Sequence, residues 1–171
     1  MRIRSDLFTV ILTSIVLAAL SQAAVAADRA QAQMMDANGA SVGMVELHKT
    51  PHGTLLHAKL HDLAEGAHAF HVHAVGKCEA PFKSAGGHFN PEGKHHGILS
   101  AEGMHVGDMP NIHVPASGDL EIEVLNVHLM LDSSLFDEDG AAIVIHEGPD
   151  DYASDPAGAA GPRIACGVIS Q

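Results

Sequence analysis

The feature that most constrains this chain is a short string in which apolar and histidine residues alternate: Phe70, His71, Val72 and His73. On a β-strand, side chains two positions apart lie on the same face, roughly 6.6 Å apart for a rise of about 3.3 Å per residue. This spacing places two imidazoles where both can reach one metal ion, while Phe70 and Val72 face the opposite side and enter a core. We therefore expect this strand to form a wall of a β-structure and half of a metal site.

The sequence after residue 27 predicts further strands. Helical periodicity is nearly absent, and short alternating apolar runs are separated by turn residues, including the hairpin signal Asn38-Gly39. Seven or eight short strands are typical of an all-β antiparallel sandwich or barrel. We expect strands at 30–35, 41–48, 54–63, 67–74, 120–131, 141–146 and 163–169.

A long segment between these strands, residues 75–118, is rich in Gly, Pro, His and Asn and shows little strand pattern. A structureless stretch of about 40 residues is unusual in a compact domain and is normally functional. We expect bound metal to give this segment the order that it lacks in hydrogen bonds. The aromatic residues Phe82 and Phe89 argue against a disordered insertion. The segment contains five further candidate ligands: His88, His95, His96, His105 and Asp108.

The first 27 residues have the features of a secretory signal. Arg2 and Arg4 precede a mostly apolar run from Leu7 to Leu20, and the A-x-A cleavage pattern ends at Ala26. The apolar run is shorter than the roughly 20 residues that span a bilayer. We predict a cleaved signal peptide over 1–27 and one domain over 28–171, periplasmic or secreted, with no membrane partner after cleavage. An uncleaved anchor is the alternative.

Charge and cysteine content narrow the class of protein further. The chain has 9 Lys and Arg against 21 Asp and Glu, a formal net charge of −12, which argues against a nucleic acid as partner. Both cysteines, Cys78 and Cys166, lie after the predicted cleavage point. An even count in an oxidising compartment predicts one disulfide, and two free buried thiols are the alternative.

Five strings, taken together, resemble a known family. They are Phe-His-Val-His at 70–73, Ser-Ala-Gly-Gly-His-Phe-Asn-Pro at 84–91, His-Val-Gly-Asp at 105–108, Val-Ile-His-Glu at 144–147 and Arg-Ile-Ala-Cys-Gly-Val-Ile at 163–169. In this order they are similar to copper/zinc superoxide dismutase. Residues 30–69 resemble that family only in their strand pattern. The resemblance implies a Greek-key arrangement of about eight strands with long metal-binding loops.

The resemblance also implies two ligand sets that share one histidine. Four imidazoles suit Cu(II), and three imidazoles with one carboxylate suit a closed structural zinc site. His95 and His96 are adjacent, so their side chains point in different directions, and the family spacing from His88 favours His96. The copper set implied is His71, His73, His88 and His146; the zinc set is His88, His96, His105 and Asp108.

The activity implied is the dismutation of superoxide to dioxygen and hydrogen peroxide. Family analogy places Arg163 over the copper, where a guanidinium can hydrogen-bond a small anion, and gives His88 a role in proton transfer. Asp150 resembles the carboxylate that supports ligands of both metals from outside their coordination spheres. The alternatives are a non-catalytic copper/zinc-binding protein for metal storage or delivery, and a zinc hydrolase, which the closed coordination by Asp108 disfavours.

One departure from the family concerns the guidance of the anionic substrate. Many members carry lysines in the loop before the arginine, whereas residues 147–162 here contain no Lys or Arg and four acidic residues. We expect Lys83, with Lys77 and Lys94, to supply the missing positive charge. The sequence leaves both a monomer and a homodimer open.

Overall fold

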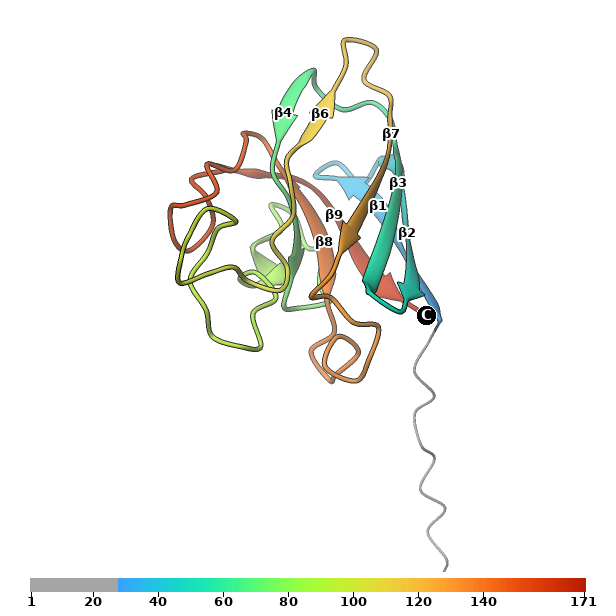
Figure 1. Cartoon of the computed structure of the whole chain (residues 1–171). Coiled ribbons are helices and arrows are strands. Elements are labelled where there is room, and N and C mark those ends of the chain that lie inside the picture. Colours follow the sequence, from blue (N-terminus) through green and yellow to red (C-terminus); the bar gives the residue numbers. More distant parts are fainter. Residues whose placement is uncertain (1–27) are drawn as a thin grey trace, which may run out of the picture.

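The computed structural model describes residues 28–171, and the predicted signal peptide at 1–27 lies outside the described residues. No helix in residues 28–171 is long and apolar enough to cross a membrane. The described residues form nine strands and one short 3-10 helix (Figure 1): β1 Arg29–Asp36, β2 Ser41–Thr50, β3 Gly53–Leu60, β4 Gly66–His68, β5 Phe70–His73, η1 Lys83–Ala85, β6 Ile112–Val114, β7 Leu120–Asn126, β8 Ala142–His146 and β9 Arg163–Ser170.

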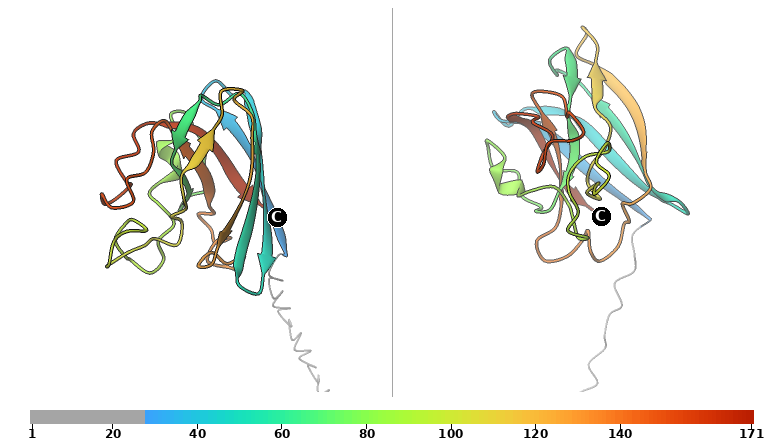
Figure 2. Two further views of the ribbon diagram at one scale, coloured as in Figure 1. Left: turned by 45° about the horizontal axis from the view of Figure 1, so that its top comes forward. Right: turned by 60° about the vertical axis from the view of Figure 1, so that its left-hand side comes forward.

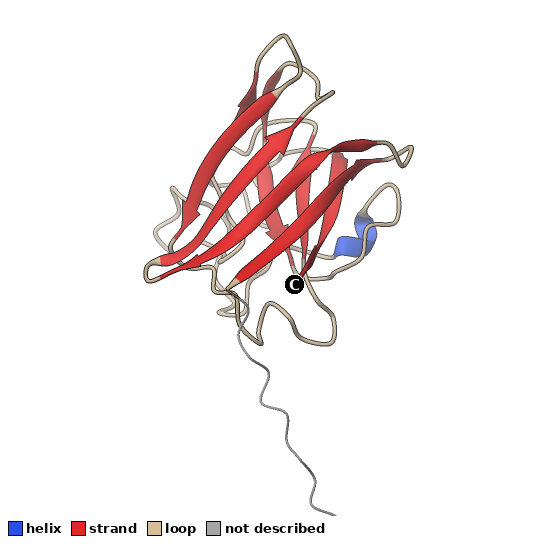
Figure 3. Ribbon diagram, turned by 90° about the vertical axis from the view of Figure 1, so that its right-hand side faces the viewer, coloured by secondary structure: helices blue, strands red, loops and turns tan. Residues whose placement is uncertain are grey.

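Seven of these strands form one curled antiparallel sheet, in the order β5-β8-β9-β1-β2-β3-β7, while β4 and β6 pair separately. Strands β1, β2, β3 and β7, which are neighbours in this sheet, run side by side in Figure 3. The long loops 74–111 and 147–162 lie together on the other side of the molecule, as both views in Figure 2 show. The all-β antiparallel fold predicted from the sequence is confirmed.

The single strand expected at 67–74 is in fact two strands, separated at Ala69. The N–H of Ala69 donates to the carbonyl of Gly148, and its carbonyl accepts from the N–H of His146, at 2.9 and 3.0 Å. Ala69 therefore pairs with the end of β8, while β4 turns away to pair with β6. The three-residue strand β6 lies in the segment for which the sequence showed little strand pattern.

The strand expected at 120–131 ends early because an asparagine side chain takes over the backbone bonding. The Oδ1 atom of Asn126 accepts the N–H groups of His128 and Leu129 at 3.0 and 2.9 Å. Its Nδ2 group donates to the carbonyl of Val106 at 2.8 Å. Asn126 thus ends β7 and attaches the long loop to the sheet.

The expectation that segment 75–118 lacks ordering hydrogen bonds is wrong. The N–H of Val72 donates to Gly107 at 2.9 Å, and the N–H of Phe89 donates to Val72 at 2.8 Å. A Cβ atom at position 107 would lie 2.2 Å from the carbonyl oxygen of Val72, so only glycine permits this approach. Two parts of the loop are therefore bonded directly to β5.

Strand β8 is buried on both faces, which explains its uninterrupted apolar run. Ile143 and Ile145 join Phe70 and Val72 in the main core, and all four are fully buried. Ala142 and Val144 face a smaller cluster on the other side, whose remaining buried members are Phe82, Ala85 and Cys166. Strand β5, which carries His71 and His73, pairs with β8 and is therefore attached to a strand that is buried throughout.

The predicted disulfide is confirmed. Cys78 and Cys166 are bonded across 88 positions, with their Cα atoms 5.6 Å apart. Cys166 lies in β9 and Cys78 lies at the start of the long loop. The bridge therefore fastens this loop to the central part of the sheet.

Candidate metal centre

Strand β5 places its two histidines as the alternation predicted. His71 and His73 are fully buried on the face opposite Phe70 and Val72, and their ring centroids are 6.4 Å apart. Both imidazoles therefore lie on one side of the strand, beneath the long loops, while the apolar side chains fill the core.

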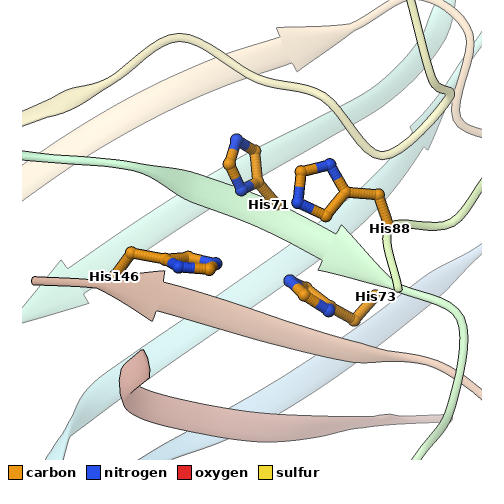
Figure 4. A group of neighbouring side chains, drawn as sticks. All are labelled: His71, His73, His88 and His146. Atoms are coloured by element: carbon orange, nitrogen blue, oxygen red, sulfur yellow. The ribbon is translucent and has the colours of Figure 1, made fainter. Parts of the chain in front are cut away.

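Two further histidines from distant segments complete this group (Figure 4). His146 is the last residue of β8, beside β5, and His88 lies in the long loop opposite His73. All four rings are buried, and one ring nitrogen from each lies within 4.8 Å of those of the others. We call this set the four-histidine group: His71, His73, His88 and His146.

Three members of the four-histidine group use one ring nitrogen for a hydrogen bond that fixes the ring. The Nε2 group of His71 contacts Asp150 Oδ2 at 2.8 Å. The Nδ1 atoms of His73 and His146 contact the carbonyls of Gly86 and Gly161, at 3.0 and 3.1 Å. In each case the second ring nitrogen is left to face the interior of the group.

Those interior nitrogens have no hydrogen-bond partner. They are the Nδ1 atom of His71 and the Nε2 atoms of His73, His88 and His146, and all four are buried. Since buried polar atoms nearly always have a partner, four such atoms around one point require an explanation. Four imidazole nitrogens are a donor set that suits copper, so these residues fit that metal.

Burial also keeps the rings in the form that a metal needs. It lowers the pKa of His73 to about 2 and the pKa values of His71 and His146 to about 4. These imidazoles are therefore neutral at pH 7, and their lone pairs are available for coordination.

A second donor group adjoins the first and shares His88. Oδ1 of Asp108 contacts the Nδ1 atoms of His88, His96 and His105 at 2.8, 3.0 and 3.4 Å. Its Oδ2 accepts the backbone N–H groups of Gly97 and His105, at 2.9 and 3.0 Å. We call His88, His96, His105 and Asp108 the three-histidine–aspartate group, and all four residues are buried. Three imidazoles and one carboxylate fit a structural zinc ion.

Asp150 connects the two groups. One of its oxygens accepts from His71 at 2.8 Å and the other accepts from His96 Nε2 at 3.0 Å. Although burial opposes it, hydrogen bonds to Asp108 and Asp150 raise the pKa of His96 to about 9. Both ring nitrogens of His96 thus contact carboxylates. Despite burial, His71 and His96 hold the pKa of Asp150 well below its usual range.

Arg163 is held beside the four-histidine group by two backbone carbonyls. Its Nη1 and Nη2 groups donate to Phe82 and Gly86, each at 2.6 Å. The carbonyl of Gly86 also receives His73, so one peptide group positions both side chains. The positive charge of Arg163 contributes to lowering the pKa values of His73 and His146, after the larger effect of burial.

The remaining candidates divide clearly. His96 is fully buried, whereas its neighbour His95 is exposed and contacts Glu102 at 3.5 Å. Lys77 and Lys94 form ion pairs with Glu79 and Glu92, at 3.0 and 2.6 Å. Lys83 is exposed in η1 and forms no ion pair with the residues that the structure describes.

Sequence reasoning missed several groups that orient the rings. The carbonyls of Gly86 and Gly161 set which nitrogen of His73 and His146 faces inward, and the loop conformation that presents them leaves no residue-type signal. Asn111, whose side chain bonds to the backbone of Asp150, and Tyr152, whose hydroxyl accepts the N–H of Asn111, were also missed. Tyr152 is the only tyrosine in the chain, and this was the one available signal.

Comparisons with known proteins agree on one family. A family model described as copper/zinc superoxide dismutase matches residues 41–169. "Superoxide dismutase [Cu-Zn] 1" of Aquifex aeolicus is 50% identical over 147 residues, which are 82% of this chain and 87% of that protein. A solved SOD-like protein from Bacillus subtilis is 36% identical, with a TM-score of 0.77 over 81% of this chain and 96% of that one. The solved Cu/Zn superoxide dismutase of Brucella abortus is 29% identical, with a TM-score of 0.71 over 83% of this chain and 99% of that one.

Proposed function

This chain belongs to the copper/zinc superoxide dismutase family, and we propose that it dismutates superoxide at a copper ion joined through His88 to a structural zinc ion. Two superoxide anions and two protons give one dioxygen and one hydrogen peroxide. The protein's own residues must hold the metals, position the anion and manage the protons.

The four-histidine group would hold copper. When bound, copper supplies the one-electron reduction and oxidation that the two half-reactions need, which zinc cannot supply. His71, His73 and His146 each present one neutral, unpartnered nitrogen, and their outer hydrogen bonds keep those nitrogens aimed inward. The protein's own hydrogen bonds thus fix the direction of these three rings.

We propose that His88 accepts and then donates a proton during the reaction. Its Nδ1 atom belongs to the three-histidine–aspartate group and its Nε2 atom faces the four-histidine group. We assign Nε2 the role of accepting a proton in one half-reaction and delivering it to the forming peroxide in the other. The contact of Nδ1 with Asp108 keeps the ring in place while this happens.

Arg163 is proposed to bind the anion. Its guanidinium is fixed by the carbonyls of Phe82 and Gly86. Burial lowers its pKa, but the ordinary pKa of arginine is so high that the group stays charged. An open surface cavity of about 440 Å³ adjoins His146 and is lined by loop residues such as Pro156 and Ala160. We propose that a small anion approaches the four-histidine group through this cavity, whose lining includes Asp155 as well as His146 but not Arg163.

The single observation that carries this proposal is the set of four unpartnered buried nitrogens around one point. The protein retains this set together with Arg163, which favours turnover over metal storage or delivery. The predicted signal peptide, the disulfide and the bacterial relatives support export to the periplasm or the medium.

The test is to reconstitute the protein with copper and zinc, measure both metals per chain and follow superoxide decay by stopped-flow absorbance. We expect one copper and one zinc per chain and fast dismutation. His146→Ala should lose copper and activity but keep zinc, and the matched change His95→Ala should keep all three. A protein that holds both metals without dismutating superoxide would instead support the storage or delivery function.

A further inference from the structure

The chain's only tyrosine lies beside the carboxylate that connects the two metal groups. The N–H of Tyr152 donates to Asp150 Oδ1 at 2.6 Å, and Tyr152 adopts a left-handed backbone conformation with φ of 63°. Non-glycine residues rarely adopt this conformation unless the surroundings hold them there. The contacts of Tyr152 show what these surroundings are.

The side chain of Asn111 forms hydrogen bonds with the backbone of Asp150. Its Oδ1 atom accepts the N–H of Asp150 at 2.8 Å, and its Nδ2 group donates to the carbonyl of Asp150 at 2.9 Å. One side chain therefore satisfies both backbone groups of the residue whose carboxylate receives His71 and His96. Because Asn111 is three positions after Asp108, the same segment carries a proposed zinc ligand and the side chain that bonds to the backbone of Asp150.

The hydroxyl of Tyr152 completes the arrangement by holding Asn111. It accepts the backbone N–H of Asn111 at 2.7 Å. The carbonyl of Tyr152 accepts the N–H of Leu99 at 3.0 Å, and a Cβ at Gly97 would lie 2.1 Å from that carbonyl. Tyr152 thus contacts the segments that follow His96 and Asp108 as well as Asp150 itself.

We propose that Tyr152 and Asn111 are positioning residues that fix the Asp150 carboxylate between the copper and zinc ligands. This inference rests on the proposed function. Loss of the Tyr152 hydroxyl or of the Asn111 side chain removes hydrogen bonds that hold Asp150 in place. His96 and His71 then lose a defined orientation toward their metals. Removing a group that hydrogen-bonds directly to a metal ligand, as Asp150 does, typically lowers metal affinity by roughly 10- to 100-fold, and this range is an upper bound for residues that act through Asp150.

The experiment uses zinc and cobalt(II) as probes on three variants of the mature protein. Tyr152→Phe removes only the hydroxyl, and Asn111→Ala removes both bonds to Asp150. Ser154→Ala is the matched control, because its hydroxyl lies in the same loop and bonds to Asp151 rather than Asp150. The readouts are the zinc Kd in competition with a chromophoric chelator and the visible spectrum of bound cobalt.

We expect the zinc Kd to rise roughly threefold in Tyr152→Phe and up to about tenfold in Asn111→Ala, with an altered cobalt spectrum in both. Ser154→Ala should match the unmodified protein. A change in the cobalt spectrum separates positioning from general destabilisation, which would leave the ligand field of the bound fraction unaltered. Unchanged affinity and spectrum in both variants would overturn the inference alone, whereas an unmodified protein that binds no zinc would overturn the proposed function as well.

Discussion

Opening the disulfide between Cys78 and Cys166 should strongly lower stability and also slow dismutation. The bridge closes a loop of 88 positions, and the chain-entropy model gives a stabilisation of about 4–5 kcal/mol for a loop of this length. For a domain of this size, such a loss lowers Tm by roughly 10–15 °C. The activity should fall because the bridge fastens the segment whose carbonyls, at Phe82 and Gly86, hold Arg163.

The assay is urea unfolding of the metal-free protein, since bound metal would add its own stabilisation. The oxidised protein is compared with the reduced one and with the double variant Cys78→Ala and Cys166→Ala. Because Cys166 is fully buried in the cluster with Phe82 and Val144, its truncation adds roughly 1 kcal/mol of lost packing to the loss of the cross-link. Equal unfolding free energies for the oxidised and reduced proteins would contradict a stabilising role for the bridge.

Three further changes test separate parts of the centre. Gly158→Ala should weaken binding of both metals by about tenfold or more, because the new Cβ would lie 1.8 Å from Asp150 Oδ1 and would displace that carboxylate. Metal titration measures the affinities, and unaltered values would contradict this prediction. Arg163→Lys should slow dismutation about tenfold with full metal content, since one ammonium cannot reproduce the two-carbonyl fork, and an unchanged rate would remove Arg163 from anion binding. Lys83→Glu should lower the dismutation rate and the dependence of that rate on salt, measured by stopped flow at several ionic strengths. Lys77→Glu should lower the rate less, because Lys77 is already paired with Glu79, and equal effects of the two changes would contradict the special role of Lys83.

Side-chain alternation was enough to predict most of the sheet and half of the proposed copper site. The period of two in 70–73 fixes which side of β5 each residue faces, because a strand permits no other arrangement. The division at Ala69 could not be foreseen, since it depends on a hydrogen bond to Gly148, a residue 79 positions away in the chain. The three-residue strand β6 is too short to show a pattern.

The chemistry of the centre was predictable only in residue type. Histidines and a carboxylate at family spacing indicate metals, and the burial of His96 but not His95 agrees with the choice made from spacing. The inward direction of each ring depends on carbonyls at Gly86 and Gly161, which belong to loops without periodicity. Every residue has such a carbonyl, so composition carries no trace of which one is used.

We propose above that His88 lies between two metal ions and contacts both. The most direct measurement is the electron paramagnetic resonance spectrum of the protein loaded with copper in the four-histidine group and cobalt(II) in place of zinc. A shared imidazole predicts magnetic coupling, so that the copper signal is broadened or lost when cobalt enters. A copper signal that is unchanged with both metals bound would show that His88 does not join them.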